Sequence, residues 1–184
     1  MAFTAFDILT AEEQNNLVEN IEALAAGTGL EPRSVPPSKW TNPYCFSAYL
    51  TANQTGLVTG SFNTINCNAE FTDPNSNYNI ATYTYTIPVT GVYEFNINAQ
   101  TLTSSTDQAI TVKVNGTTSY NVGRYPNASA NGSRTLDGSI TLLMTAGQTV
   151  VAQMYAVAAS WVISGDTNGQ NYGARWSGKL VHAT

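Results

Sequence analysis

The stretch YTYTIPVTGVYEF, residues 83–95, holds two runs of alternating side chains that meet at a corner. Side chains of a β-strand point alternately to its two faces, so the first run places Tyr83, Tyr85 and Ile87 on one face and threonines on the other. Pro88 cannot donate a ladder hydrogen bond and is expected at a strand end or bulge. The stretch therefore predicts one strand before Pro88 and a second strand after the glycine that follows it.

The chain from Tyr44 onward continues this pattern. Short alternating runs are separated by turn-forming residues, and Asn115-Gly116 and Asn131-Gly132 are strong turn signals. The candidate strands are residues 44–51, 61–65, 79–87, 92–102, 109–115, 119–125, 136–145, 149–158, 160–164 and 174–182. About ten short strands with no helix between them predict an all-β domain, namely a sandwich, barrel or jelly roll.

The N-terminal part has a different character. Residues 10–26 predict a helix that begins at a capping box of Thr10 and Glu13 and carries a narrow apolar stripe. The stripe consists of Leu17, Ile21 and Leu24. Four prolines in residues 31–43 favour an extended link. We therefore divide the chain into an N-terminal arm and helix (1–30), a proline-rich linker (31–43) and a β-domain (44–184).

The composition excludes several functions. Charged residues make up 10% of the chain, against about a quarter in typical domains, and the net charge is −5. No basic cluster exists that would bind nucleic acid or an anionic membrane surface. The chain contains no apolar run of membrane-spanning length, and its first residues lack the basic region of an export signal. We therefore expect a protein that is made in the cytoplasm of a host cell without a signal peptide.

The residues that carry chemistry are few. The single histidine, His182, lies near the C-terminus, and the acidic residues of the β-domain lie mostly in or beside turns. A loop with Asp166, Asn168 and Asn171 is rich in oxygen ligands but lacks the glycine and glutamate positions of a calcium loop. We expect no enzyme activity, no cofactor and no metal site. Cys45 and Cys67 leave two interpretations open, either one disulfide or two buried thiols.

Several segments share the spacing of one known family. The quoted stretch, extended back to residue 78, contributes Tyr78, Tyr85, Pro88, Gly91, Tyr93 and Phe95. Further pieces follow in order as FSAYL (46–50), VKVNG (112–116), SITLLMTAGQTVVAQ (139–153) and WSGKLV (176–181). Over residues 44–182 the chain resembles the globular head of complement component one-q and the tumour-necrosis-factor-like jelly-roll superfamily. Tyr83, Gln148 and Trp176 depart from the family pattern of Gly, Asp and Phe, so no ligand site of animal members is carried over.

The resemblance implies a jelly-roll sandwich of about ten antiparallel strands that assembles as a homotrimer. Two interpretations of the aromatic corner stay open, because its side chains suit either the core of one domain or a three-fold interface. An aromatic ring with a polar tip fits a buried interface when its hydroxyl group finds a partner. The interface hypothesis assigns Tyr83, Tyr85, Tyr93 and Phe95 to contacts between subunits.

The N-terminal segment offers a second resemblance. Residues 6–30 are similar to leaders of tail-fibre and head-decoration proteins of bacterial viruses. This resemblance implies a virion protein whose arm and helix bind the major capsid protein or another virion protein. The anchor residues on this hypothesis are Phe3, Phe6, Ile8, Leu9, Leu17, Ile21 and Leu24.

The favoured function is a trimeric capsid decoration (cement) protein, because only about 40 residues precede the β-domain and a tail fibre needs a longer shaft. The alternative is the tip of a tail fibre that recognises glycans on the host surface. Aromatic side chains suit sugar stacking, and this alternative assigns the glycan contact to Trp161 and Tyr172.

Overall fold

The computed structural model describes residues 42–184 apart from residue 104 and the segments 127–132 and 168–172. The described part contains eleven β-strands and no helix. The predicted arm and helix, and the linker up to residue 41, lie outside the described residues. The all-β prediction is confirmed, and every strand pair is antiparallel.

The strands follow the chain at short intervals. They are β1 (Cys45–Tyr49), β2 (Phe62–Thr64), β3 (Ala69–Thr72), β4 (Tyr78–Asn79), β5 (Thr84–Thr86), β6 (Gly91–Thr101), β7 (Gln108–Val114), β8 (Thr118–Tyr125), β9 (Arg134–Met144), β10 (Thr149–Ala156) and β11 (Arg175–Ala183). The hairpin between β7 and β8 turns at Asn115-Gly116 as predicted. Both residues have positive φ, as a tight hairpin of this type requires.

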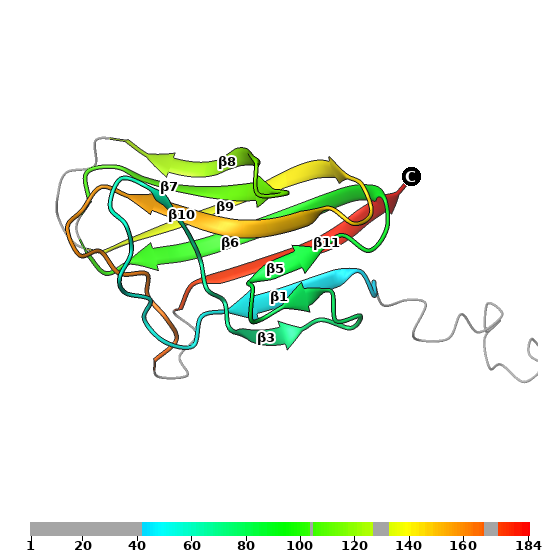
Figure 1. Ribbon diagram of the computed structural model, residues 1–184, viewed down its shortest axis with the longest axis horizontal. Coiled ribbons are helices and arrows are strands. Elements are labelled where there is room, and N and C mark those ends of the chain that lie inside the picture. Colours follow the sequence, from blue (N-terminus) through cyan, green and yellow to red (C-terminus); the bar gives the residue numbers. More distant parts are fainter. Residues whose placement is uncertain (1–41, 104, 127–132, 168–172) are drawn as a thin grey trace, which may run out of the picture. The chain divides into compact units, whose positions relative to one another are not determined.

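The strands form two sheets (Figure 1). The first, sheet A, has five strands in the order β3-β1-β11-β6-β9. The second, sheet B, has six strands: five run in the order β4-β5-β10-β7-β8, and β2 pairs with β10. The first and last strands of the domain, β1 and β11, are neighbours in sheet A. Strand neighbours far apart in sequence and two antiparallel sheets make the domain a jelly-roll sandwich.

The corner that opens the sequence differs from its prediction in one respect. Residues 79–87 do not form one strand, because a turn separates β4 from β5. The side chain of Asn79 causes this break, since its Oδ1 accepts hydrogen bonds from the backbone N–H groups of Ala81 (2.8 Å) and Thr82 (3.2 Å). Tyr83 lies in this turn with φ 58°. It therefore does not share the strand alternation of Tyr85, as the sequence pattern had predicted.

Two other strand predictions need correction. Residues 69–72 form β3, which the sequence did not indicate, because three of its four side chains are exposed and no apolar alternation marks it. Residues 160–164 were predicted as a strand. They contain instead only the isolated bridges that Ile163 makes with Gln54 and Thr101.

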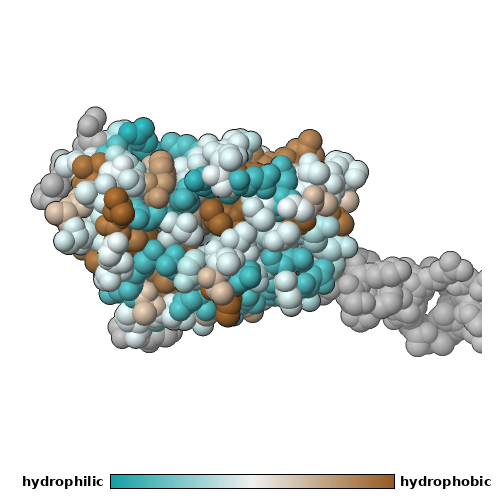
Figure 2. Space-filling model, in the orientation of Figure 1, coloured by the Kyte–Doolittle hydropathy of each residue, from teal (hydrophilic) through white to brown (hydrophobic). Residues whose placement is uncertain are grey.

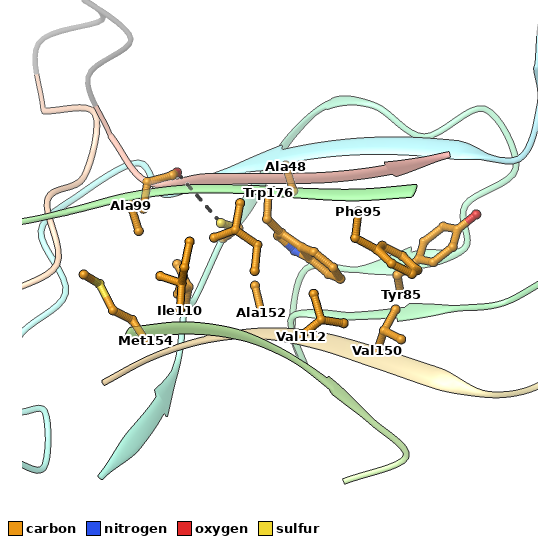
Figure 3. Packing of buried hydrophobic residues seen from close by; sticks show 14 of the residues in the cluster. Ala48, Tyr85, Phe95, Ala99, Ile110, Val112, Val150, Ala152, Met154 and Trp176 are labelled. Carbon is orange, nitrogen blue, oxygen red and sulfur yellow. Dashed lines mark hydrogen bonds between the residues drawn. The ribbon is translucent and has the colours of Figure 1, made fainter. Parts of the chain in front are cut away.

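The core lies between the two sheets (Figure 3). Trp176, Phe95 and Ala48 point inward from sheet A, while Val112 and Val150 point toward them from sheet B. Aromatic rings dominate one part of this core. Phe46 stacks on Tyr85 of sheet B with 4.3 Å between ring centroids, and it meets Trp176 edge-on at 4.5 Å. The quoted corner therefore supplies a ring that joins the two sheets.

Gly178 makes room for these rings. Its register partners are Phe46 on β1 and Phe95 on β6, and both side chains face the core. A Cβ atom at this position would lie 2.7 Å from a ring carbon of each phenylalanine. The glycine of the WSGKLV segment is therefore required by close packing.

We predict that Gly178→Ala lowers the free energy of unfolding by about 1–3 kcal/mol, because the added methyl group displaces buried rings. Chemical denaturation followed by circular dichroism measures this change. Ser119→Ala is the control, since Ser119 is an exposed residue of β8 in sheet B, and it should change stability by less than about 0.5 kcal/mol. Equal stability of the two variants would contradict the packing role of Gly178.

Candidate assembly face on sheet A

The outer face of sheet A is formed by side chains that alternate with the core residues of its strands. Strand pairing arranges these side chains in rows across the sheet. One row contains Tyr49, Arg175, Asn98 and Asp137. The next contains Ser47, Ser177, Asn96 and Ser139, and the third contains Cys45, Lys179, Glu94 and Thr141. The inward-facing core residues determine the register of the strands, and the register determines which side chains share a row on the outer face.

The middle of this face is hollow. The hollow has a volume of about 350 Å³, and its lining includes the three serines and the asparagine of the central row together with Gly138. The hollow forms because the central row has short side chains, whereas the neighbouring rows carry longer ones such as Arg175 and Lys179. Serine and asparagine side chains both donate and accept hydrogen bonds. The hollow is therefore a concave surface that suits contact with another polar backbone or side chain.

One end of the face is apolar. Leu143 on β9 is 70% exposed and lies opposite Val92 on β6. Val181 is 57% exposed and lies in the β-bulge of β11, where the pairing shifts between Leu180 and His182. These three residues, Val92, Leu143 and Val181, are called the apolar end below. Neighbouring exposed apolar side chains on a polar sheet are a feature of surfaces that bind another protein.

The opposite corner carries aromatic rings. Phe71 on β3 is 52% exposed and stacks on Tyr49 with 4.4 Å between centroids. The guanidinium group of Arg175 lies 5.2 Å from the centroid of the Phe71 ring. Stacked aromatic and arginine side chains are enriched at protein interfaces. The apolar end and this aromatic corner therefore flank a polar centre.

Two opposite charges on the face form an ion pair. Lys179 Nζ lies 3.0 Å from Glu94 Oε2, across the pairing of β11 with β6. The hydrogen bond and charge of Lys179 lower the pKa of Glu94. The pair is exposed, so it contributes little to the stability of one chain. Its effect is to leave this row without net charge.

The residues of the interface hypothesis do not contribute to this surface in the single chain. Tyr85, Tyr93 and Phe95 are each 0% exposed and belong to the core. The hydroxyl group of Tyr93 donates to the carbonyl of Val89 at 2.9 Å, and burial raises the pKa of both tyrosines. Tyr83 is half-buried in its turn. The core of one chain accounts for the burial of the first three side chains, and their role between subunits stays an untested prediction.

The glycan residues are placed only in part. Trp161 is 1% exposed and lies in the core, so little of its ring is accessible to a sugar. Tyr172 lies outside the described residues, and so do the anchor residues Phe3, Phe6, Ile8, Leu9, Leu17, Ile21 and Leu24. Within the described ranges, no group of three His, Cys, Asp or Glu side chains comes together as metal ligands. Asp166 is described, whereas Asn168 and Asn171 are not.

The cysteines are unpaired. Cys45 is half-buried on the outer face of sheet A, and Cys67 is 0% exposed in the core. Burial raises the pKa of the Cys67 thiol to about 12. Because the unfolded thiol titrates near pH 9, it loses its proton in the unfolded chain first as pH rises. The contribution of Cys67 to stability is therefore complete below about pH 9 and is lost as pH rises toward about 12.

The two sheets, their order and the position of the aromatic core define a jelly roll of the tumour-necrosis-factor-like class. A family model described as the C1q domain matches residues 45–178, and the chain belongs to this family. The globular domain of zebrafish complement 1qA protein has 19% sequence identity and a TM-score of 0.57, covering 77% of this chain and 99% of that chain.

Two other solved structures share the fold. Eiger TNF from S. frugiperda has 10% identity and a TM-score of 0.56, with 77% of this chain and 94% of that chain covered. Murine APRIL has 7% identity and a TM-score of 0.54, with 75% and 98% covered. No curated protein matches the chain. The family membership confirms the resemblance of residues 44–182 to the complement and tumour-necrosis-factor-like domains.

We predict that iodoacetamide labels one cysteine of the native protein at pH 8. Cys45 is partly accessible and reacts slowly, because burial raises its pKa, whereas Cys67 stays protonated and shielded. Intact mass spectrometry counts the added groups. Cys45→Ala should take up no label until the protein is unfolded. Two rapid additions to the native chain, or a mass lowered by a disulfide, would contradict this placement.

Proposed function

We propose that the protein forms a homotrimer through the outer face of sheet A and serves as a non-enzymatic structural protein of a virus particle. The observation that carries the assembly is the composition of this face, in which a hollow polar centre lies between the apolar end and an aromatic corner. Leu143 at the apolar end is 70% exposed in the single chain, and an interface on this face would bury it. Membership of the C1q domain family supports a trimer, because such domains associate in threes.

The size of the face shows how much of the interface it can form. Neighbouring strands lie about 4.8 Å apart and rise about 3.4 Å per residue, so the five strands of sheet A, with a mean length of eight residues, present on the order of 650 Å². A stable interface buries about 800 Å² per partner. Because each subunit of a trimer takes part in two such interfaces, the outer face of sheet A supplies less than half of the area required, and the adjoining edges of the domain supply the rest. Burial of the apolar end supplies part of the free energy, at about 25 cal/mol per Å² of apolar surface.

The assignment to a virus particle rests on the low content of charged residues, 10% of the chain, and on the resemblance of the N-terminal segment to phage leaders. Figure 2 shows hydrophobic residues as small separate patches among hydrophilic ones on the face in view. The described residues contain no helix with the length and hydropathy of a membrane span. The resemblance of residues 6–30 to leaders of phage structural proteins supports the proposed attachment to a capsid through residues 1–30, and three copies would turn a weak contact into a firm one. The favoured role is therefore capsid decoration, with the major capsid protein as partner.

We predict that the purified protein has three times the 19.7 kDa mass of one chain in multi-angle light scattering. Leu143→Glu should convert it to a monomer at micromolar concentration, because a carboxylate would be buried in the interface without a partner. Val58→Glu is the matched control, since Val58 is 61% exposed in a loop away from sheet A. This control should remain a trimer.

A monomeric wild-type protein at micromolar concentration would refute the proposed assembly. A trimer that persists in Leu143→Glu would place the interface on another face. Folding of each variant is checked by circular dichroism. In the trimer, labelling of Cys45 should also be slower than in the Leu143→Glu monomer, because Cys45 lies on the same face.

We predict that deletion of residues 1–30 abolishes binding to purified capsids that lack the protein, while residues 44–184 remain folded. Cosedimentation with the capsids measures binding, and quantitative mass spectrometry of intact particles gives the copy number. Hundreds of copies are expected for a decoration protein. A few copies per particle would instead favour the tail-fibre tip. Unchanged binding of the truncated chain would refute the anchor.

A further inference from the structure

The outer face of sheet B carries a second surface feature, which none of the predicted sites includes. A hollow of about 250 Å³ is lined by Phe62, Ala109, Asn121, Arg124 and Tyr155. These residues come from β2, β7, β8 and β10, which are neighbours in sheet B. Strand pairing places Phe62, Tyr155, Ala109 and Arg124 in one row across the sheet. The hollow is therefore built by regular strands of the fold.

Two aromatic rings form one side of the hollow. Phe62 is 45% exposed, although its ring lies 5.3 Å from that of the half-buried Tyr155. Ala109, the next residue in the row, has a short side chain and lets the two rings border an open floor. An exposed phenylalanine at the rim of a hollow offers an apolar ring face to a ligand. The hollow is smaller than pockets for drug-sized molecules, so it suits a single ring.

The other side of the hollow is polar and has no net charge. Arg124 binds Asp107 in a two-point arrangement, with Nε 3.2 Å from Oδ1 and Nη2 2.7 Å from Oδ2. This pairing fixes the guanidinium group and neutralises its charge, so the hollow is not an anion site. The exposed Asn121 adds an amide that both donates and accepts hydrogen bonds. The amide of Asn121 and the guanidinium group of Arg124 therefore line the hollow together with the rings of Phe62 and Tyr155.

The row that contains Asn121 includes a further polar group, the hydroxyl of Thr111. Thr111 pairs with Asn121 across β7 and β8, and with Gln153 across β7 and β10. Thr111 is 3% exposed, and its hydroxyl oxygen has no hydrogen-bonding partner in the described part of the chain. A buried hydroxyl group without a partner is costly. Thr111 does not line the hollow, so a ligand there would reach the neighbouring Asn121 instead.

We propose that this hollow binds a neutral sugar ring, with the C–H face of the ring on Phe62 and Tyr155 and its hydroxyl groups hydrogen-bonded to Asn121 and the Arg124–Asp107 pair. A pyranose has an apolar face and a polar edge, and the hollow has the same division. A purely apolar ligand would leave Asn121 without a partner, and an acidic ligand would face Asp107. The site does not depend on the proposed trimer, because it lies on the other sheet.

Saturation-transfer NMR with the full-length protein tests this proposal. The probes are the methyl pyranosides of glucose, galactose, mannose and N-acetylglucosamine, each at about 10 mM. We expect at least one of them to bind with a dissociation constant on the order of 1 mM. Phe62→Ala and Asn121→Ala should each weaken binding about tenfold or more, and both side chains are exposed enough that the fold is retained.

Tyr120→Ala is the matched control. Tyr120 is an exposed aromatic residue on the same strand as Asn121, but it pairs with the core residue Val112 and so has the opposite orientation. This variant should bind the same pyranoside as tightly as the wild type. Absence of binding by every probe would overturn the proposal. Binding that is unchanged in both Phe62→Ala and Asn121→Ala would overturn it as well, because the sugar would then occupy another surface.

Discussion

The stack of Phe46 on Tyr85 is the contact on which the rest of the domain depends. It joins sheet A to sheet B with 4.3 Å between ring centroids, and the chain leaves space for it by placing Gly178 between Phe46 and Phe95. Aromatic rings of this size cannot be accommodated by small shifts in a close-packed interior. The position of these rings therefore sets which side chains of the neighbouring strands face inward.

Both proposed surfaces follow from that constraint. Once Phe46, Phe95 and Trp176 face the core, period-two alternation sends Ser47, Asn96 and Ser177 to the outer face of sheet A. The same rule in sheet B turns Ile110 and Val112 inward and Thr111 outward. A shift of one residue in register would exchange core and surface along a whole strand. The hollow polar centre of sheet A and the aromatic hollow of sheet B are thus consequences of how the core is packed.

The sequence predicted what depends on local pattern and missed what depends on long-range pairing. The alternation of Tyr85, Thr86 and Ile87 and the turn at Asn115-Gly116 were predicted correctly because neighbouring residues determine them. Tyr83 left the predicted strand because the side chain of Asn79 makes a turn that competes with it. The hollow on sheet B was missed because it depends on the pairing of Phe62 with Tyr155, which lie far apart in the chain. Trp161 was assigned to a glycan contact under the alternative function, and the structure places it in the core, 1% exposed.

The two proposed surfaces support one another through valency. The low charge of the chain gives little electrostatic steering, so its partners must be recognised by short-range contacts. A single shallow hollow with two rings and a few polar groups binds one sugar ring weakly. A trimer built through sheet A leaves sheet B of each subunit free and carries three such hollows in a fixed geometry. Three weak sites that engage one glycan-covered surface bind much more tightly than one, without any new contact. Assembly through one sheet would in this way make recognition by the other sheet effective.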